Sequence, residues 1–496
     1  MTQTANKADF PAVDLQNLVS QLAGILPQDS ILHEQEDLRP YECDGLSSYR
    51  QLPLVAVLPD SVGQVQKIMR LCYSLGLPIV ARGAGTGLSG GALPYAKGVL
   101  LSLAKFSKII EIDKDVCIAR VQPGVRNLAI SQAVDHLGLY YAPDPSSQIA
   151  CTIGGNVAEN SGGVHCLKYG LTVHNIQQIK IVTIEGDLIT VGGGGLDSPG
   201  YDLLALMTGS EGMLAVIVEV TVKLLPKPQR VQALLAAFDD VMNAGKAVGN
   251  IISAGIIPAG LEMMDRLAIK AAEDFVHAGY PADAEAILIC ELDGAETEVT
   301  EQTDAVRDIL NNSGATEVRV AKDEQERVNF WKGRKNAFPA VGRISPDYYC
   351  MDGTIPRKSL PLVLQSMADM SVKYGLAVAN VFHAGDGNLH PLILFDASIA
   401  GELEKAEEFG GKILELCIRV GGTITGEHGV GTEKLNQMCV QYKSTELSQF
   451  HAVKAAFDHK GLLNPGKAVP TLHRCAEFGA MHVHNGELPY PELERF

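Results

Sequence analysis

Two histidines in this chain have the residue types and spacing of divalent metal ligands. His383 and His390 lie in residues 378–395, where two apolar segments flank Asp386-Gly387, a strong signal for a two-residue hairpin turn. Such a turn would pair His383 directly with His390, with their Cβ atoms about 5 Å apart on one face. Two imidazoles placed in this way can converge on one metal ion. The alternative is an ordinary pair of hairpin histidines, and a longer loop would spoil this register.

An acid and a third histidine, Glu427 and His428, lie among five glycines in residues 421–432. A loop with so many glycines would not be stable alone, which indicates a functional site more than an ordinary surface loop. The alternative is that the Glu-His pair is incidental, as a lone pair of this kind usually is. Combined with the hairpin, it predicts a shell of His383, His390 and Glu427 for zinc, manganese or iron. Arg334 or Lys335, near the only tryptophan, could hold a substrate carboxylate, which arginine does bidentately. The alternative is that both lie on a solvated helix face.

The densest glycine stretch follows a short apolar segment, residues 78–81, that predicts a buried strand. Five residues from Gly83 to Gly91 are glycine, which lets a backbone approach a ligand and aim several N–H groups at one anion. Gly85, Gly87 and Gly90 match G-x-G-x-x-G, but that dinucleotide fingerprint must open a helix, and residues 98–103 predict a strand. A pyrophosphate loop between two strands and a purely structural turn both remain open.

A second glycine-rich stretch, residues 143–163, mixes glycines with small hydroxyl and amide side chains. Such a surface offers hydrogen bonds to a sugar or a flat heteroaromatic ring without filling the ligand's space. A long irregular loop is the plain alternative, but loops of this length are usually functional. The segment Gly461–Lys467 nearly matches a Walker A motif, but Ala468 replaces the required Ser or Thr, so that reading fails.

Composition limits the class of protein. With 496 residues, 46% of them hydrophobic, and 50 glycines, the chain predicts two or three compact, loop-rich domains. A formal charge of −17 argues against binding nucleic acid or an anionic membrane surface. We expect no membrane span and no signal peptide, because no run of 18 apolar residues exists and residues 1–10 lack an apolar core. Ten cysteines without C-x-x-C spacing predict buried, reduced thiols, a cytoplasmic location and no iron–sulfur cluster of its own.

The hydrophobic periodicity predicts an α+β protein whose second domain has a mainly antiparallel sheet. Helices are expected at residues 11–25, 63–75, 239–254, 261–277, 295–312 and 444–458. Strands are expected at residues 53–59, 98–103, 108–113, 116–122, 176–184, 215–224, 287–292 and 317–321. The helix at 63–75 should bury Val65, Ile68, Met69 and Cys72.

These motifs together resemble the FAD-linked oxidase family of vanillyl-alcohol oxidase-type flavoproteins. The resemblance covers roughly residues 20–470, including residues 346–352, and also extends into residues 471–484. It is specific because all of the motifs occur together. It rests on residues 82–91, Ile153-Gly-Gly-Asn156, Asn160-Ser-Gly-Gly163, Gly209-Ser-Glu-Gly212, His383-x6-His390, Gly426-Glu-His-Gly429 and Asn464-Pro-Gly466.

The resemblance implies five segments. They are an N-terminal helical segment (1–50), an FAD-binding domain (51–228), a substrate- and metal-binding domain (229–443), a helix and Asn-Pro-Gly segment returning to the flavin (444–470), and a tail (471–496). It implies contacts to FAD from Arg82, Gly83, Ala84, Gly85, Thr86, Gly87, Ser89, Gly90, Gly91, Pro143, Asp144, Ser147, Gly154, Gly155, Asn156, Asn160, Gly162, Gly163, Glu211, Gly212 and Asn464.

The same resemblance implies the chemistry. Members oxidise D-2-hydroxy acids, here glycolate first and D-lactate also, with D-lactate or D-2-hydroxyglutarate dehydrogenation as the alternative. His383, His390 and Glu427 would bind a divalent metal, Arg334 and Asn388 the substrate, and His428 would take the hydroxyl proton. FAD should be non-covalent, since Thr86 or a neighbour stands where covalent relatives carry histidine.

Electrons leaving the flavin would pass to partners, because this chain has no cluster motif. The resemblance implies a second flavin subunit and an iron–sulfur subunit, with any attachment to the inner membrane made through them. Two other classes remain to be tested. A non-catalytic flavin subunit would be expected to lose the His383, His390, Glu427 and His428 set, and a metallohydrolase would leave the glycine loops unexplained.

Overall fold

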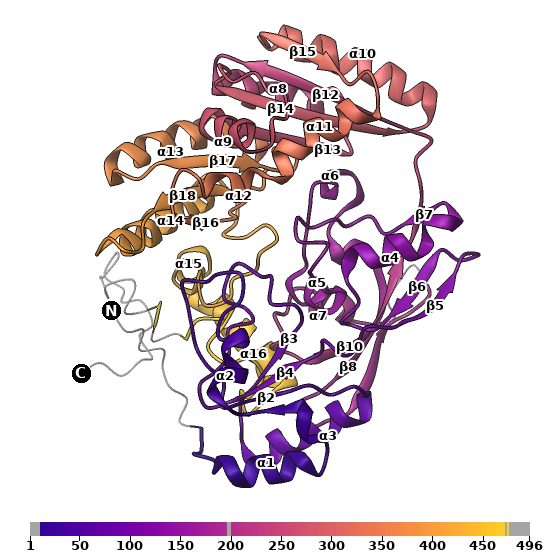
Figure 1. The fold of residues 1–496 in the computed structure, drawn as a ribbon, viewed down its shortest axis with the longest axis vertical. Coiled ribbons are helices and arrows are strands. Elements are labelled where there is room, and N and C mark those ends of the chain that lie inside the picture. The colour runs from indigo at the N-terminus through magenta and orange to yellow at the C-terminus, as the bar shows by residue number, and fades with distance from the viewer. Residues whose placement is uncertain (1–9, 196–199, 472–473, 476–496) are drawn as a thin grey trace. The chain divides into compact units, whose positions relative to one another are not determined.

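The computed structural model describes residues 10–195, 200–471 and 474–475. The chain divides into two compact units, each built from separate stretches of sequence (Figure 1). The first unit comprises Met1–Ser161, Leu171–Pro226 and His428–Phe496, and the second comprises Gly162–Gly170 and Lys227–Glu427. The predicted N-terminal segment and tail both include positions outside the described residues.

The first unit contains two main sheets and one short strand pair. The four-stranded sheet has the order β1-β2-β4-β3, with β1 (Ile31–Leu32), β2 (Val55–Val57), β3 (Ile79–Arg82) and β4 (Val99–Ser102). The five-stranded sheet has the order β5-β6-β10-β8-β9, with β5 (Ile109–Asp113), β6 (Ile118–Val121), β8 (Ile176–Val182), β9 (Leu188–Gly192) and β10 (Val216–Lys223). The short pair joins β7 (Leu139–Tyr140) to β11 (Leu225–Pro226).

Helix α3 shows why the four-stranded sheet forms. Its apolar residues recur at helical spacing, and the four that the sequence predicts to face inward are the four it buries, Val65, Ile68, Met69 and Cys72. They share one hydrophobic core with strands β2, β3 and β4. The helices of this unit are α1 (Leu15–Ala23), α2 (Gln35–Leu38), α3 (Val62–Leu75), α4 (Asn127–Val134), α5 (Ile153–Glu159), α7 (Leu203–Met207), α15 (Leu435–Gln441) and α16 (Ser444–Phe457).

The second unit is built on one seven-stranded sheet whose neighbouring strands are all antiparallel. Its order is β15-β12-β14-β13-β17-β18-β16, with β12 (Arg230–Phe238), β13 (Gly260–Asp265), β14 (Ala286–Gly294), β15 (Glu317–Val320), β16 (Asp347–Cys350), β17 (Val378–Phe382) and β18 (Pro391–Phe395). The helices are α6 (Cys166–Tyr169), α8 (Val241–Ser253), α9 (Arg266–Val276), α10 (Glu296–Asn312), α11 (Glu324–Lys335), α12 (Ala337–Val341), α13 (Leu360–Tyr374) and α14 (Glu402–Arg419). The mainly antiparallel sheet expected for this domain is confirmed.

Two expectations about local structure are wrong. Residues 261–277 do not form one helix, because β13 occupies Gly260–Asp265 and α9 begins only at Arg266. Asp265 ends the strand and caps the helix by accepting from the Ala268 N–H. Residues 143–163 are not loop throughout, since α5 occupies Ile153–Glu159 despite two glycines in its first turn.

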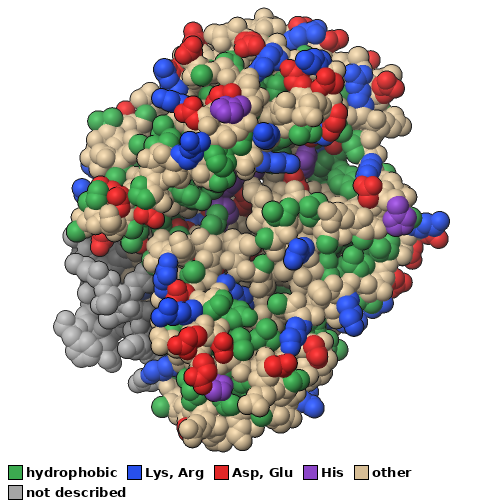
Figure 2. All heavy atoms as spheres, in the orientation of Figure 1, with side chains coloured by type: hydrophobic (Ala, Val, Ile, Leu, Met, Phe, Trp, Pro, Cys, Tyr) green, Lys and Arg blue, Asp and Glu red, His purple; other side chains and the backbone are tan. Residues whose placement is uncertain are grey.

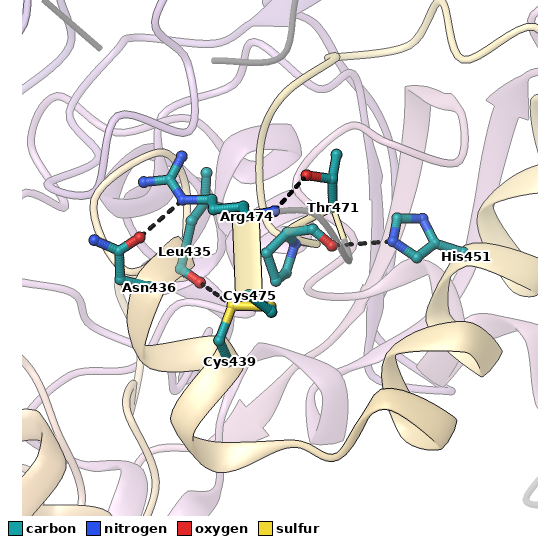
Figure 3. The surroundings of a disulfide bond; sticks show 8 residues. Leu435, Asn436, Cys439, His451, Thr471, Arg474 and Cys475 are labelled. Carbon is teal, nitrogen blue, oxygen red and sulfur yellow. Dashed lines mark hydrogen bonds between the residues drawn. A yellow bond between two sulfur atoms is a disulfide. The ribbon is translucent and has the colours of Figure 1, made fainter. Parts of the chain in front are cut away.

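The cysteines also differ from expectation. Cys439 on α15 and Cys475 form a disulfide, whereas the other eight are free thiols (Figure 3). The sequence separation of 36 residues gives no signal for this pair, but the chain returns after α16 and brings the two Cα atoms to 5.2 Å, a normal disulfide separation. The expectation that all ten cysteines are reduced is therefore wrong for Cys439 and Cys475.

The surface carries no single dominant charge cluster on the face in view. Lys and Arg side chains lie scattered among acidic ones in Figure 2. Among the described helices, none combines the length and the apolar character needed to cross a bilayer.

Candidate active site

The hairpin that carries His383 and His390 has a longer turn than the sequence predicts. The β17–β18 ladder pairs Asn380 with Pro391, and the same register brings His383 opposite Asn388 instead of His390. The register is thus shifted by two residues and the turn holds four residues, Ala384 to Gly387. A shift of two keeps every side chain on its face, so the imidazole rings still meet diagonally, with centroids 4.9 Å apart.

Glu427 completes the predicted ligand set. Its Oε1 atom lies 3.3 Å from His383 Nε2 and 3.1 Å from His390 Nε2. One ligand atom from each residue falls within 4.8 Å of the others, and the two histidines are buried. Burial alone would raise the pKa of Glu427, but the two imidazoles hold it well below its ordinary value. Two imidazole nitrogens and one carboxylate oxygen fit zinc, manganese or iron.

A residue that the sequence analysis missed fixes the orientation of His383. Glu262 on β13 accepts a hydrogen bond of 2.8 Å on Oε1 from His383 Nδ1. Burial would raise the pKa of Glu262, yet His383 and Arg334 hold it below its usual range, so the carboxylate is ionised and can only accept. Nδ1 of His383 therefore carries a proton, which leaves Nε2 as the ring nitrogen that would bind a metal.

A second buried acid, Asp352, holds the loop that carries Glu427. Its Oδ2 atom accepts from the backbone N–H groups of Gly426 at 2.9 Å and Glu427 at 2.8 Å. The Thr425 hydroxyl donates to the same carboxylate at 3.0 Å. Asp352 is fully buried, so these bonds fix the backbone from which Glu427 reaches the two histidines.

Asp352→Asn is expected to weaken metal binding as well as folding. The amide oxygen of asparagine can take the place of Oδ2, but without the negative charge the hydrogen bonds from the Gly426 and Glu427 N–H groups weaken, at a cost of about 1–3 kcal/mol in total. Metal affinity should fall about 10–100-fold, as for other groups that orient ligands. Thermal unfolding and a cobalt(II) titration of the metal-free protein measure the two effects separately. Unchanged cobalt affinity would show that Glu427 needs no such support, or that it is not a ligand.

The predicted substrate residues Asn388 and Arg334 lie on the same buried cluster. Asn388 Nδ2 donates to Glu427 Oε1 at 3.4 Å, and its Oδ1 accepts from no residue in the described part of the chain. A Cβ atom at position 426 would lie 2.4 Å from Asn388 Oδ1, so only glycine fits there. Arg334 is 3% exposed and turns Nε and Nη2 toward Glu262 Oε2, at 2.8 and 2.7 Å. That edge of its guanidinium is therefore not available to a substrate carboxylate.

In the first unit the predicted pyrophosphate loop connects β3 to β4, two parallel neighbouring strands. None of the backbone N–H groups from Ala84 to Gly91 donates a hydrogen bond to the residues that the structure describes. Gly85 and Gly90 have φ of +70° and +76°, the left-handed region that favours glycine. A run of unpaired N–H groups fits a bound pyrophosphate, so this loop fits FAD.

The start of α5, in the second predicted FAD stretch, lies beside that loop. A Cβ atom at Gly83 would lie 2.3 Å from the hydroxyl of Thr152, the N-cap residue of α5. This hydroxyl is buried and bonds to none of the described residues. Gly154 packs on Pro123, and Asn156 bonds Asn127 at 2.8 Å.

Other predicted FAD residues are held by their own contacts. Asn160 adopts a φ of +55° and its side chain accepts from Val173 N–H, while the Pro143 carbonyl accepts from Asn127. Asp144, Ser147, Gly155 and Gly212 lie in the first unit with these residues, whereas Gly162 and Gly163 belong to the second unit.

Three distant segments close on the glycine loop within the first unit. Glu211 accepts from the N–H groups of Val430 and Gly431, both at 2.7 Å. Asn464 donates to the carbonyls of Gly91 at 3.0 Å and Glu211 at 2.6 Å. The Asn-Pro-Gly segment thus packs on the loop that the sequence assigns to FAD.

The same contact includes two residues that sequence reasoning missed. Lys467, the lysine of the rejected Walker-like segment, donates to the carbonyls of Gly91 and Leu93, and burial lowers its pKa to about 7. Burial and the neighbouring Glu211 raise the pKa of Glu159, whose Oε1 would lie 2.7 Å from a Cβ at Gly91. Their only sequence signal is charge in glycine-rich surroundings.

His428 begins the last segment of the first unit, directly after the predicted ligand Glu427. Its carbonyl accepts from the Ser89 hydroxyl at 2.8 Å, and the Thr432 N–H bonds the Ser89 carbonyl at 3.0 Å. The backbone of the predicted base is therefore fixed to the predicted FAD loop. One peptide bond separates it from the metal ligand set.

Comparison with known proteins identifies both domains of the chain. Residues 53–192 match the sequence profile of an FAD binding domain, and residues 227–468 match that of the C-terminal domain of FAD linked oxidases. Glycolate oxidase subunit GlcD of Escherichia coli (strain K12) is 67% identical over 487 residues, 98% of each chain. The chain belongs to the FAD-linked oxidase family.

More distant relatives extend the comparison. A D-lactate dehydrogenase of Anaerostipes hadrus is 31% identical over 84% of this chain and 89% of its own. The crystal structure of p-cresol methylhydroxylase has a TM-score of 0.78 at 19% identity and covers 92% of this chain and 97% of that one. The expected vanillyl-alcohol oxidase-type fold is confirmed, and the protein is an FAD-linked oxidoreductase.

Proposed function

We propose that this FAD-linked oxidase oxidises glycolate to glyoxylate, with non-covalent FAD and one divalent metal ion. The observation that carries the proposal is the convergence of His383, His390 and Glu427 within 4.8 Å, in a chain 67% identical to a glycolate oxidase subunit. A metal site in an FAD-linked oxidase suits a substrate that offers oxygen ligands, as the hydroxyl and carboxylate of a 2-hydroxy acid do.

Each side chain has a role that its environment supports. His383, His390 and Glu427 hold the metal, which when bound would polarise the substrate hydroxyl. Arg334 attracts the substrate carboxylate, and Asn388 presents the unpaired Oδ1 as a hydrogen-bond acceptor. His428 accepts the hydroxyl proton, a role that suits an imidazole at neutral pH. FAD, when bound, would accept the hydride from the α-carbon.

A D-lactate dehydrogenase is the second candidate, because the relative from Anaerostipes hadrus bears that name. A D-2-hydroxyglutarate dehydrogenase on the same scaffold would use the same groups. Glycolate has no side chain on its α-carbon, so the three substrates differ in the volume that the pocket must accept.

An anaerobic visible titration tests the proposal and ranks these substrates. Purified protein, with and without prior chelation, is mixed in turn with glycolate, D-lactate and D-2-hydroxyglutarate. We expect a yellow protein that glycolate bleaches fastest, and that chelation protects from bleaching. Bleaching by a larger acid alone would replace the substrate and keep the chemistry. A colourless protein that cannot be reconstituted with FAD would contradict the proposal altogether.

We also propose that the chain works as one subunit of a complex, since the name of the Escherichia coli relative is that of a subunit. A second flavin subunit and an iron–sulfur subunit would carry electrons away from FAD. We place the protein in the cytoplasm, with contact to the inner membrane made through those partners. In such a reducing compartment Cys439 and Cys475 would be thiols for part of their lifetime.

A further inference from the structure

Glu262 is a buried acid flanked by apolar residues in strand β13. It is 1% exposed, and Leu261, Met263 and Met264 around it are equally buried. An ionised carboxylate in such a place is costly unless both oxygens are paired. Both are paired here, and their partners are two residues already assigned to the active site.

The first partner is fixed by the sheet. The β13–β17 ladder pairs Met263 with Phe382, and the next pair in that register is Glu262 with His383. Directly opposed residues share a face of the sheet, which places Glu262 Oε1 2.8 Å from His383 Nδ1. The backbone ladder thus determines the direction in which the metal ligand His383 points.

The second partner comes from a helix. Arg334 on α11 approaches Glu262 Oε2 with Nε and Nη2, and its remaining nitrogen, Nη1, donates to none of the described residues. The backbone of α11 packs directly on the ring of Tyr280 at Gly333, where even a Cβ atom would lie only 2.3 Å from the ring. This close packing limits any shift of the helix. The Tyr280 hydroxyl also donates to the Phe330 carbonyl. Nη1 is therefore presented from a fixed position.

We propose that Glu262 is a positioning residue that ties the metal site to the carboxylate site. One oxygen aims His383 at the metal and the other aims Arg334 at the substrate, so neither group can move without the other. This selects ligands that place a carboxylate beside a second oxygen donor on the adjacent carbon, the class of 2-hydroxy and 2-oxo acids. The inference rests on the proposed function. It adds the residue that couples the metal ligand His383 to the carboxylate-binding Arg334.

The chain offers a matched control in Glu291 on the neighbouring strand β14. Glu291 is 4% exposed, and its carboxylate also binds one histidine and one arginine, His165 at 3.2 Å and Arg327 at 2.8 Å. Because Gly260 pairs with Glu291, the control residue lies on the same face of the sheet as Glu262. It contacts none of the proposed ligands or substrate residues among the described contacts.

The test compares Glu262→Gln with Glu291→Gln in the FAD-loaded protein after removal of bound metal. Cobalt(II) serves as the metal probe through its visible bands, and oxalate serves as the carboxylate probe through its effect on those bands. Glu262→Gln is expected to weaken cobalt binding about 10–100-fold and oxalate binding at least tenfold. Glu291→Gln should lower the unfolding temperature and leave both constants within twofold of wild type.

Two further variants keep the test decisive. If Glu262→Gln does not fold, Glu262→Asp retains the charge, is too short to reach both partners, and should still lose affinity for one probe or both. Arg334→Lys should weaken oxalate alone and leave cobalt binding within threefold. Wild-type affinities in the Glu262 variants, or losses no larger than those of Glu291→Gln, would overturn the role of Glu262. Wild-type protein that binds no cobalt would instead overturn the metal site itself.

Discussion

Replacing His428 by alanine is expected to leave FAD bound and to slow flavin reduction by glycolate about 10²–10⁴-fold, the usual contribution of a general base. The substitution should preserve the local backbone, because Ser89 bonds the carbonyl of residue 428 and not its side chain. Glu427 is held separately by Asp352, so the metal content should not change. Stopped-flow absorbance of the flavin and metal analysis of the same sample measure both properties.

Added imidazole provides the control for this variant. If the missing group is a base, free imidazole should restore part of the reduction rate, and the restored rate should rise with pH through the pKa of imidazole. Reduction at the wild-type rate without any addition would contradict the assignment of His428. Loss of FAD from the variant would assign His428 to cofactor binding instead.

Replacing His390 by alanine should abolish metal binding and with it nearly all turnover. Loss of one of three protein ligands removes the polarising charge from the substrate hydroxyl, a contribution of several kcal/mol, or about 10³-fold in rate. The yellow colour should remain, because the residues that fit FAD lie in the first unit. Chelation of the wild-type protein should reproduce the loss, and zinc or manganese should reverse it only in the wild type.

His165→Ala is the matched variant for this experiment. His165 is a histidine of the same unit that pairs with Glu291 and is not one of the predicted ligands. It should keep the wild-type metal content and chelator sensitivity. If the His390→Ala variant still turned over glycolate, and chelation did not stop it, the cluster of His383, His390 and Glu427 would be structural.

Most of the fold, and the clustering of His383, His390 and Glu427, could be predicted from the sequence for a definite physical reason. Amphipathic periodicity placed α3 and its buried face, and the two apolar segments that flank Asp386-Gly387 placed the strands of the hairpin. His383 and His390 meet in spite of the wrong turn because a register error of two residues leaves both on the same face. An error of one residue would have separated them.

The supporting acids could not be found in the same way. Glu262 lies in a segment that the sequence predicts to be helical. Its contact with His383 depends on pairing between two strands that are more than a hundred residues apart in the chain. Asp352, Glu159 and Lys467 likewise act through contacts with remote backbone groups. The disulfide between Cys439 and Cys475 depends on how the chain returns after α16. Such tertiary contacts leave no local pattern.

The division of the chain has a consequence for its biosynthesis. The first unit needs residues from both sides of the second, since Val430, Gly431, Asn464 and Lys467 close on Glu211 and Gly91. The sheet of the second unit is complete once residue 395 has been made. A nascent chain therefore has all strands of its oxidase domain available while the nucleotide-binding half still waits for its last segment. Truncation before residue 430 would release a polypeptide that lacks all of these closing contacts, and truncation between residues 464 and 467 would remove those of Lys467.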